Sequence, residues 1–238
     1  MLFFVYGSES YLVREKCRQI ETRLRQDKGS LSCEHLDSCD LQQLQSKAAS
    51  LSMFGEHLCL RLDGVIKSGK IDGDAGIQFL ESIGTTVSII FIEAEPDRRG
   101  KLVKYLMKHA EVHACQPLEG EELNAWIMRT AEDRGGAFDR TAAGLLAQTA
   151  GSDLWKLSQE IDKLLAYTGG QAITAEAIQA ITIPVCEEDI FPFIDAIAEG
   201  KNARAVQLLH QNLQAGMHAL ALFRMIVRQF RLLIYARA

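Results

Sequence analysis

The chain has 238 residues, of which 47% are hydrophobic and 24% charged, so it can bury a sizeable core and form more than one domain. Its 26 basic residues against 31 acidic ones give a formal net charge of -5, and this balance does not indicate a nucleic-acid-binding protein. The apolar start, residues 2–6, has no basic residues before it and breaks at Gly7, which excludes a signal peptide and a membrane span and makes the cytoplasm the expected location.

Six cysteines are spread along the chain, and neither their spacing nor their distance from histidines fits a zinc site. We therefore expect reduced, mostly packed thiols and no bound metal ion. The histidines are scattered as well. We expect five of them on surfaces or at helix ends: His57, His109, His113, His210 and His218.

The first 117 residues alternate between strand-like and helix-like patterns. Apolar runs of strand length predict strands at residues 2–6, 58–62, 87–92 and 112–115. Stretches with helical spacing predict helices near residues 40–51, 74–83 and 99–109. A first helix is predicted after Ser8, a plausible N-cap, with one apolar face made of Val13, Cys17, Ile20 and Leu24. Such alternation favours a parallel, doubly wound α/β sheet.

The pattern changes at Pro117, after which only helical spacing is found. Glycines punctuate the helices up to residue 183, and Pro184 with the acidic residues 187–189 marks a linker. A last helical region begins near residue 190. We therefore predict three domains: an α/β domain at 1–117, a small all-helical domain at 118–185 and the start of another helical domain at 186–238.

An α/β domain followed by a helical lid is a common plan for nucleotide-hydrolysing proteins, so the turn at Gly7 is where a phosphate loop is expected. That loop needs a glycine, four residues, then Gly-Lys-Ser/Thr. The three places instead hold Leu12, Val13 and Arg14, which argues against nucleotide hydrolysis. Other catalytic motifs are missing from the sequence as well, so we expect no catalytic residue and no cofactor.

Three acidic residues follow predicted strands and could be mistaken for magnesium ligands: Asp63, Glu93 and Glu95. Without the phosphate-loop lysine, we expect them to cap turns.

Four segments carry a resemblance to a known family. Residues 4–15 look like a degenerate phosphate loop, and residues 50–58 are similar to a short element in which a bulky residue and a phenylalanine precede a strand. Residues 151–164 closely resemble a lid signature, Gly-(Asn/Ser)-Asp-Leu followed by Glu-x-x-Lys-Leu. Residues 190–197 and 228–233 look like the start of a collar domain. Together they resemble the delta subunit of the bacterial DNA polymerase III clamp loader over nearly the whole chain.

The resemblance implies an AAA+-like α/β domain with a degenerate phosphate loop, a helical lid and the start of an oligomerising collar. It implies a non-catalytic subunit of a DNA-directed DNA polymerase holoenzyme, which binds and opens the sliding clamp for loading onto primed DNA without hydrolysing ATP. The implied partners are the beta clamp, the gamma/tau and delta-prime subunits and, within the complex, primed DNA, with no membrane. Because the family continues further, we expect the chain to be truncated inside the collar.

The resemblance also assigns residues to clamp binding. Met53 and Phe54 match the pair that enters the clamp, and Leu51 belongs to the same predicted site. Two exposed apolar side chains at a helix end can fill a partner's pocket. The alternative is that Phe54 folds back into its own core.

A second candidate surface lies near the end of the chain. Arg224, Arg228 and Arg231 follow one another at steps of four and three, opposite a predicted apolar stripe that includes Phe223 and Val227. This basic stripe is a candidate contact with DNA phosphate or a partner. The alternative, favoured by the acidic overall charge, is a solvated or partner-facing helix side.

Two other functions stay open. A different non-catalytic AAA+-like replication subunit, delta-prime-like or helicase-loader-like, would share the fold but not the Met53–Phe54 element. An active ATPase is the other alternative, and it is less favoured.

Overall fold

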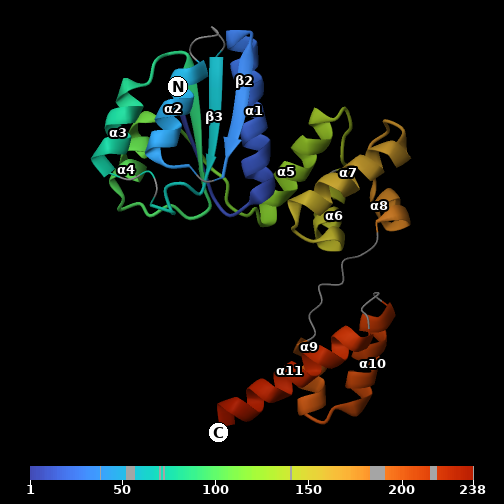
Figure 1. Ribbon diagram of the computed structural model, residues 1–238. Coiled ribbons are helices and arrows are strands. Elements are labelled where there is room, and N and C mark those ends of the chain that lie inside the picture. The colour runs from blue at the N-terminus through green and yellow to red at the C-terminus, as the bar shows by residue number, and fades with distance from the viewer. Residues whose placement is uncertain are drawn as a thin grey trace. The chain divides into compact units, whose positions relative to one another are not determined.

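The computed structural model describes residues 1–37, 39–51, 57–69, 71, 73–139, 141–182, 191–214 and 219–237 (Figure 1). The chain divides into two compact units, Met1–Pro117 and Leu118–Ala238. Each unit is considered by itself below. The finer division of the second unit into residues 118–185 and 186–238 stays a prediction.

The first unit is built on a five-stranded sheet whose neighbouring strands all pair in parallel, in the order β2-β3-β4-β1-β5. The strands are β1 (Leu2–Tyr6), β2 (Leu31–Leu36), β3 (His57–Asp63), β4 (Val87–Glu93) and β5 (Glu111–Ala114). The helices between them are α1 (Ser10–Lys28), α2 (Leu41–Leu51), α3 (Gly73–Ser82) and α4 (Lys101–His109). The predicted parallel α/β sheet is confirmed.

Two details of this unit differ from the prediction. Strand β2 was not predicted, because its six residues include Ser32, Glu34 and His35 and it lies at the edge of the sheet, where one side is solvated. The N-cap of α1 is Glu9 and not Ser8. The Glu9 carboxylate accepts a hydrogen bond from the Tyr11 amide at 3.1 Å.

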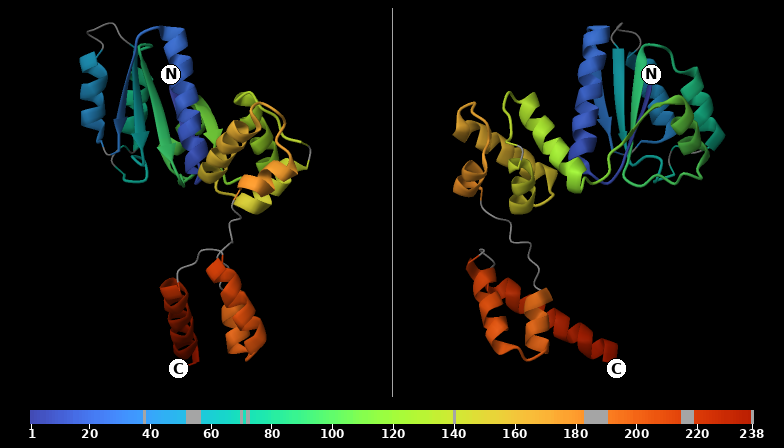
Figure 2. Two further views of the ribbon diagram at one scale, coloured as in Figure 1. Left: turned by 90° about the vertical axis from the view of Figure 1, so that its right-hand side faces the viewer. Right: turned by 180° about the vertical axis from the view of Figure 1, so that it is seen from behind.

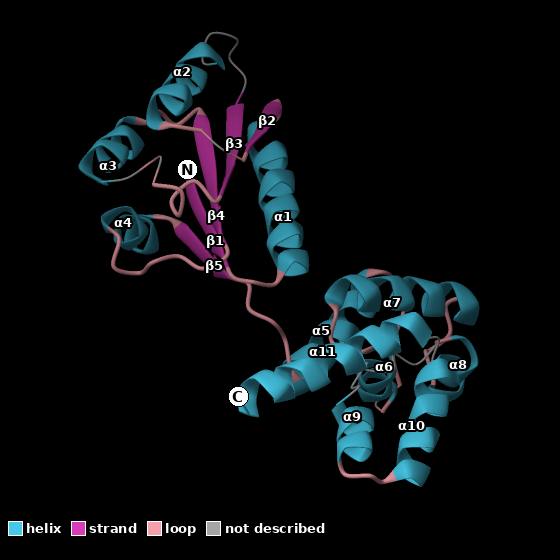
Figure 3. Cartoon of the chain, turned by 60° about the horizontal axis from the view of Figure 1, so that its bottom comes forward, coloured by secondary structure: helices cyan, strands magenta, loops and turns pink. Residues whose placement is uncertain are grey.

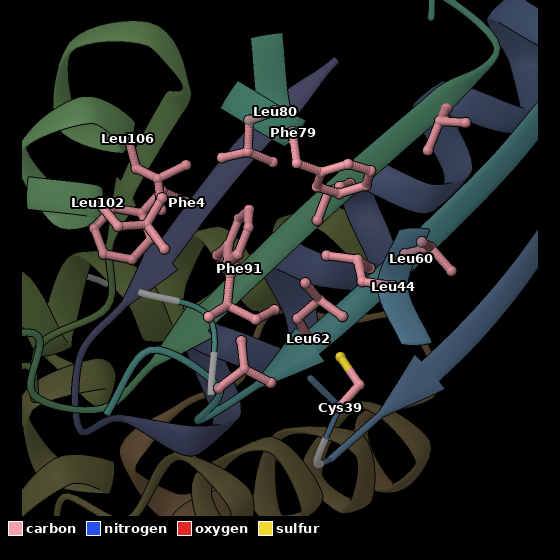
Figure 4. Packing of buried hydrophobic residues seen from close by; sticks show 14 of the residues in the cluster. Phe4, Cys39, Leu44, Leu60, Leu62, Phe79, Leu80, Phe91, Leu102 and Leu106 are labelled. Atoms are coloured by element: carbon pink, nitrogen blue, oxygen red, sulfur yellow. The ribbon is translucent and has the colours of Figure 1, made fainter. Parts of the chain in front are cut away.

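The sheet separates two apolar layers, because successive side chains of a strand point to opposite faces. Phe3 and Val5 face α1, where they pack with the stripe predicted from the sequence: Val13, Cys17, Ile20 and Leu24. Phe4 faces the other layer, which packs against α2, α3 and α4 and includes Leu44, Leu60 and Phe91 (Figures 3 and 4). A parallel sheet buries both of its faces under helices, so each face needs its own layer of apolar side chains.

The second unit is helical throughout its named elements. It begins with α5 (Gly120–Asp133), α6 (Ala142–Ala150), α7 (Leu154–Thr168) and α8 (Ala175–Ile181). Helix α7 starts where the Asp153 side chain accepts hydrogen bonds from the Trp155 and Lys156 amides, and it ends at Gly169, which has a left-handed backbone. Arg134, after α5, donates to both the backbone and the hydroxyl of Ser158 and to Asp162, which fixes α7 to α5.

Three further helices follow: α9 (Phe191–Ala198), α10 (Asn202–Gln214) and α11 (Ala219–Arg237) (Figure 2). They share a small apolar cluster of their own, formed by Phe193, Ile194, Ala196, Ala205 and Leu222. None of the helices in the described ranges is both long enough and apolar enough to cross a bilayer.

Candidate functional site

The turn between β1 and α1 contains only three residues, Gly7, Ser8 and Glu9, because the helix begins at Ser10. Leu12, Val13 and Arg14, which stand at the positions of a phosphate loop's Gly-Lys-Ser/Thr, therefore lie inside the first turns of α1. A phosphate loop needs an extended run of bare amides that can wrap an anion. This turn is too short to provide one.

Two backbone amides of the turn, those of Gly7 and Glu9, already have protein partners. The Gly7 amide donates to the Glu93 carbonyl at 3.0 Å, and the Glu9 amide donates to the Cys115 carbonyl at 3.1 Å. The carboxylate of Glu9 occupies the N-terminus of α1, which is where an anionic ligand is favoured by the helix dipole and the free amides. A phosphate at this end would meet the negative charge of Glu9, which already accepts the Tyr11 amide.

Gly7 is required at this turn by its surroundings. Its φ of 140° lies in the region that side-chain-bearing residues avoid. A Cβ atom on residue 7 would stand 1.9 Å from the Cys115 carbonyl oxygen. The turn is therefore held directly against the backbone of Cys115, the residue that follows β5.

Glu93, at the end of β4, is 1% exposed and closes the loop that follows β3. Its Oε1 atom accepts hydrogen bonds from the Ile66 amide at 2.7 Å and the Lys67 amide at 3.4 Å. Burial raises the pKa of this carboxyl, and the two amides oppose the increase. The predicted turn-capping role is confirmed for Glu93.

Asp63 and Glu95, the other two strand-end acids, are both exposed. Among the residues that the structure describes, no group of three or more histidine, cysteine, aspartate or glutamate side chains is arranged to hold a metal ion.

The predicted clamp-binding residues begin at the end of α2 and continue in the sequence toward β3. Leu51 is the last residue of α2, while Met53 and Phe54 lie outside the described residues. Leu44 is fully buried, and Leu41 and Ala48 pack against the same cluster, so these three residues form the inner face of α2. Each of these three residues fixes α2 to the sheet.

The chain is anchored again directly after residue 56. His57 is 7% exposed, and its Nε2 atom is 2.8 Å from the Ser88 Oγ atom on the neighbouring strand. Burial lowers the pKa of His57, and the charges of Lys28 and the N-terminal ammonium lower it further. The prediction that His57 lies on the surface was wrong, because its hydrogen-bond partner is distant in the sequence.

A salt bridge between Lys47 and Glu34 joins the outer side of α2 to β2. Residues 52–56 are thus preceded by a helix and followed by a strand that are both fixed to the body of the first unit. Such anchoring is what a short binding element needs in order to be presented in a defined position.

The arginines of the second candidate surface are exposed, but the helix is oriented differently from the prediction. Leu222 is 2% exposed and packs in the cluster of α9–α11 together with the partly buried Ile226. Phe223, predicted to belong to the packed face, is 62% exposed. The apolar stripe through Phe223 and Val227 therefore lies beside Arg224, Arg228 and Arg231, and the buried residues are opposite the arginines.

The carboxylate cap of Glu9 at the N-terminal end of α1 was not predicted from the sequence. The signal was present, because an acidic residue stood immediately before the apolar helical stripe. A carboxylate at this position is favourable because it meets the positive end of the helix dipole.

Comparisons with known proteins agree with the resemblance seen in the sequence. Residues 187–238 match the family profile described as DNA polymerase III delta subunit, C-terminal domain. The chain is 25% identical to the DNA polymerase III subunit delta of Bacillus subtilis over 250 aligned positions, which cover 99% of this chain and 72% of the relative. It is 19% identical to the probable DNA polymerase III subunit delta of Aquifex aeolicus, with 98% of this chain and 69% of the relative covered.

A solved structure has the same fold. The chain superimposes on the Bacillus subtilis DNA clamp loader delta protein with a TM-score of 0.69 and 22% identity, covering 97% of this chain and 72% of that one. The predicted α/β class, a parallel sheet followed by helices, is confirmed by this similarity together with the observed sheet.

Proposed function

We propose that the chain is a delta subunit of DNA polymerase III and takes part in loading the sliding clamp onto primed DNA as a non-catalytic subunit of the polymerase holoenzyme. The observation that carries this proposal is the similarity to two delta subunits along 98–99% of the chain. The partners that the proposal implies are the beta clamp, the gamma/tau and delta-prime subunits, and primed DNA held within the complex.

The subunit is proposed to work without hydrolysing ATP. The three-residue turn at Gly7 supports this, because its amides donate to the Glu93 and Cys115 carbonyls and the Glu9 carboxylate occupies the helix end. A bound nucleotide would have to displace these partners and approach a carboxylate with its own negative phosphates.

Clamp binding is assigned to Leu51, Met53 and Phe54. The support is the family resemblance of this element and the anchoring of the chain on both sides of it, at Leu44 in α2 and at His57 in β3. Burying a methionine and a phenylalanine in a partner's pocket contributes roughly 1.5–3 kcal/mol for each side chain before the costs of association.

Opening of the clamp needs no chemistry from this subunit. A protein that binds the open or distorted ring more tightly than the closed ring shifts the equilibrium toward opening by that difference in binding free energy. We assign this role to the same element, with Met53 and Phe54 as the anchor and α2 as the neighbouring helix that meets the ring.

The test is the affinity for the cognate sliding clamp, measured by surface plasmon resonance. The Met53→Ala/Phe54→Ala variant is expected to lose at least about tenfold in affinity, as is usual for paired hot-spot residues. Leu51→Ala is measured separately. Gln26→Ala is the matched control, because Gln26 is exposed on α1, which packs on the opposite face of the sheet from α2, and circular dichroism verifies the fold of each variant. Unaltered affinity of the double variant would remove the site.

A delta-prime-like or helicase-loader-like subunit would share the fold but would not retain the clamp in a pull-down with the unmodified chain. The pull-down therefore separates these alternatives from the proposed function.

Arg224, Arg228 and Arg231 are assigned to contact with DNA or another subunit inside the assembled loader, since all three are exposed on α11. Direct DNA binding by this acidic chain alone is expected to be weak.

A further inference from the structure

Two cysteines face each other across neighbouring strands on the α1 side of the sheet. Cys33 in β2 and Cys59 in β3 are register partners in the parallel ladder. Neighbouring strands lie about 4.7–4.9 Å apart, and disulfides join residues whose Cα atoms are about 4.4–6.8 Å apart. The positions of the two residues therefore meet the main geometric requirement for a disulfide bond.

The two side chains also lie in contact. Cys59 donates a thiol hydrogen bond to the sulfur of Cys33, which means that their side chains point toward each other on one face of the sheet. Both thiols are free in this structure. Cys33 is exposed at the edge strand, whereas Cys59 is completely buried. An oxidant in solution can thus reach one member of the pair, and the second member is already next to it.

The other described cysteines differ from this pair. Cys17, on α1, is fully buried and packs in the same cluster as Cys59 and Cys115, so none of these three is reached first by a reagent. Cys39 is also buried, in the cluster on the opposite face. Among the described cysteines, only Cys33 combines exposure with a second thiol in direct contact.

We propose that Cys33 and Cys59 form a redox modification site, which a peroxide oxidises to an intramolecular disulfide. In the first step the Cys33 thiolate attacks one peroxide oxygen, the O–O bond breaks, and water leaves after protonation, so that Cys33 becomes a sulfenic acid. In the second step the Cys59 sulfur attacks the Cys33 sulfur, the S–O bond breaks, and the hydroxyl group leaves as a second water with the Cys59 proton. Two thiols and one peroxide thus give one disulfide and two waters.

The electrostatics of the pair determine the order and the pH dependence of these steps. Burial raises the pKa of Cys59 to about 12, which keeps it protonated as the donor toward Cys33. Burial also raises the pKa of Cys33 above its ordinary value, with Glu21 adding to the increase and Arg25 and the Cys59 hydrogen bond opposing it. The reaction is therefore expected to be slow at neutral pH and faster in mildly alkaline solution, because the thiolate is the nucleophile.

The disulfide would close a covalent loop from residue 33 to residue 59. That loop contains α2 and residues 52–56. A bond at its base would tie the edge strand β2 to the interior strand β3 and would restrict the unfolded chain.

The test uses the full chain treated with hydrogen peroxide at about pH 9, where thiolates are populated. Remaining thiols are alkylated after denaturation, and the peptides are mapped by mass spectrometry. The expected result is a linked peptide joining Cys33 to Cys59, which disappears after reduction. Cys33→Ser should abolish the link and leave Cys59 alkylated, while Cys17→Ser, the matched control, should retain it. Circular dichroism verifies that each variant is folded.

Three results would overturn the proposal. The first is oxidation of Cys33 to a sulfinic acid while Cys59 remains alkylated. The second is a link from Cys33 to a second molecule of the chain, seen as a dimer in a non-reducing gel. The third is a link between Cys17 and Cys59 that persists in the Cys33→Ser variant.

Discussion

Glu93 is a buried carboxylate whose two backbone donors, the Ile66 and Lys67 amides, come from the loop after β3. Replacing it leaves these donors without their partner and removes the connection between the end of β4 and that loop. Leaving a buried polar group without a hydrogen-bond partner lowers the free energy of unfolding. Glu93 is therefore expected to stabilise the fold although it stands at the end of its strand.

We expect Glu93→Ala to lower the free energy of unfolding of the first unit by about 1–3 kcal/mol. Hydrogen exchange measured at peptides from β1 and β4 reports on this unit. Glu95→Ala is the matched control, because Glu95 is an exposed acid two residues further on, and its effect should stay within about 0.5 kcal/mol. Equal exchange rates in the two variants would contradict the assigned role of Glu93.

His57 is expected to make the first unit less stable in mild acid. Its pKa in the folded chain is lowered by burial, so the unfolded chain binds more protons once the pH falls below the unfolded value of about 6.5. The contribution of neutral His57 to the free energy of unfolding is therefore present above that pH. It is lost as the pH decreases, by at most about 1.4 kcal/mol per pH unit for a single proton. Hydrogen exchange of β3 and β4 peptides at about pH 7.5 and 5.5 measures the difference.

The variant His57→Gln should have a smaller difference between the two pH values than the unmodified chain. His109→Gln serves as the control, since His109 is exposed at the end of α4. If the unmodified chain and His57→Gln lose the same stability on acidification, other groups are responsible.

Single residues were predicted well where their environment is set by neighbours in the sequence. The stripe of Val13, Cys17, Ile20 and Leu24 is an example, because helical spacing alone places these residues on one face. The burial of His57 could not be predicted in this way. Its hydrogen-bond partner, Ser88, is 31 residues away and reaches it only through the pairing of β3 with β4.

At the scale of elements, strongly apolar strands were found and the polar edge strand was not. Strand β4 is buried at every position, and all its residues are apolar except Ser88 and the terminal Glu93. Strand β2 is partly exposed along its length and so resembles a loop in composition. The orientation of α11 was also missed, because two different sets of apolar residues repeat with helical spacing and only packing decides which set is buried.

Helix α7 gives a prediction at this scale, because a single side chain caps it. Asp153→Ala should reduce the stability of the second unit by about 1 kcal/mol, since the Trp155 and Lys156 amides lose their acceptor. Both tryptophans of the chain, Trp126 and Trp155, lie in α5 and α7, so urea denaturation followed by tryptophan fluorescence reports on these helices.

Asp153→Asn is the matched control for this cap, because asparagine keeps a side-chain oxygen as the acceptor. It should retain most of the stability that the alanine variant loses. Coincident fluorescence curves for the alanine and asparagine variants would show that the cap contributes little.

For the whole molecule, the proposed independence from ATP can be tested without any partner. Because the Gly7 and Glu9 amides of the turn already donate to backbone carbonyls and the Glu9 carboxylate lies at the helix end, magnesium and ATP should leave the melting temperature unchanged and no phosphate should be released. A ligand present at a hundred times its dissociation constant would stabilise the chain by about 2.7 kcal/mol, which thermal denaturation detects easily. A rise in melting temperature together with phosphate release would contradict the proposal.

The strand order also has a consequence for how the chain is made. Strand β1 is synthesised first, yet it lies between β4 and β5, whose residues leave the ribosome only after most of the first unit has been translated. The apolar residues of β1 therefore remain unpaired until β4 has emerged up to residue 93, and the sheet is completed only when β5 follows up to residue 114. Folding of this unit on the ribosome should accordingly be delayed, and its nascent N-terminal segment is the part most in need of chaperone protection.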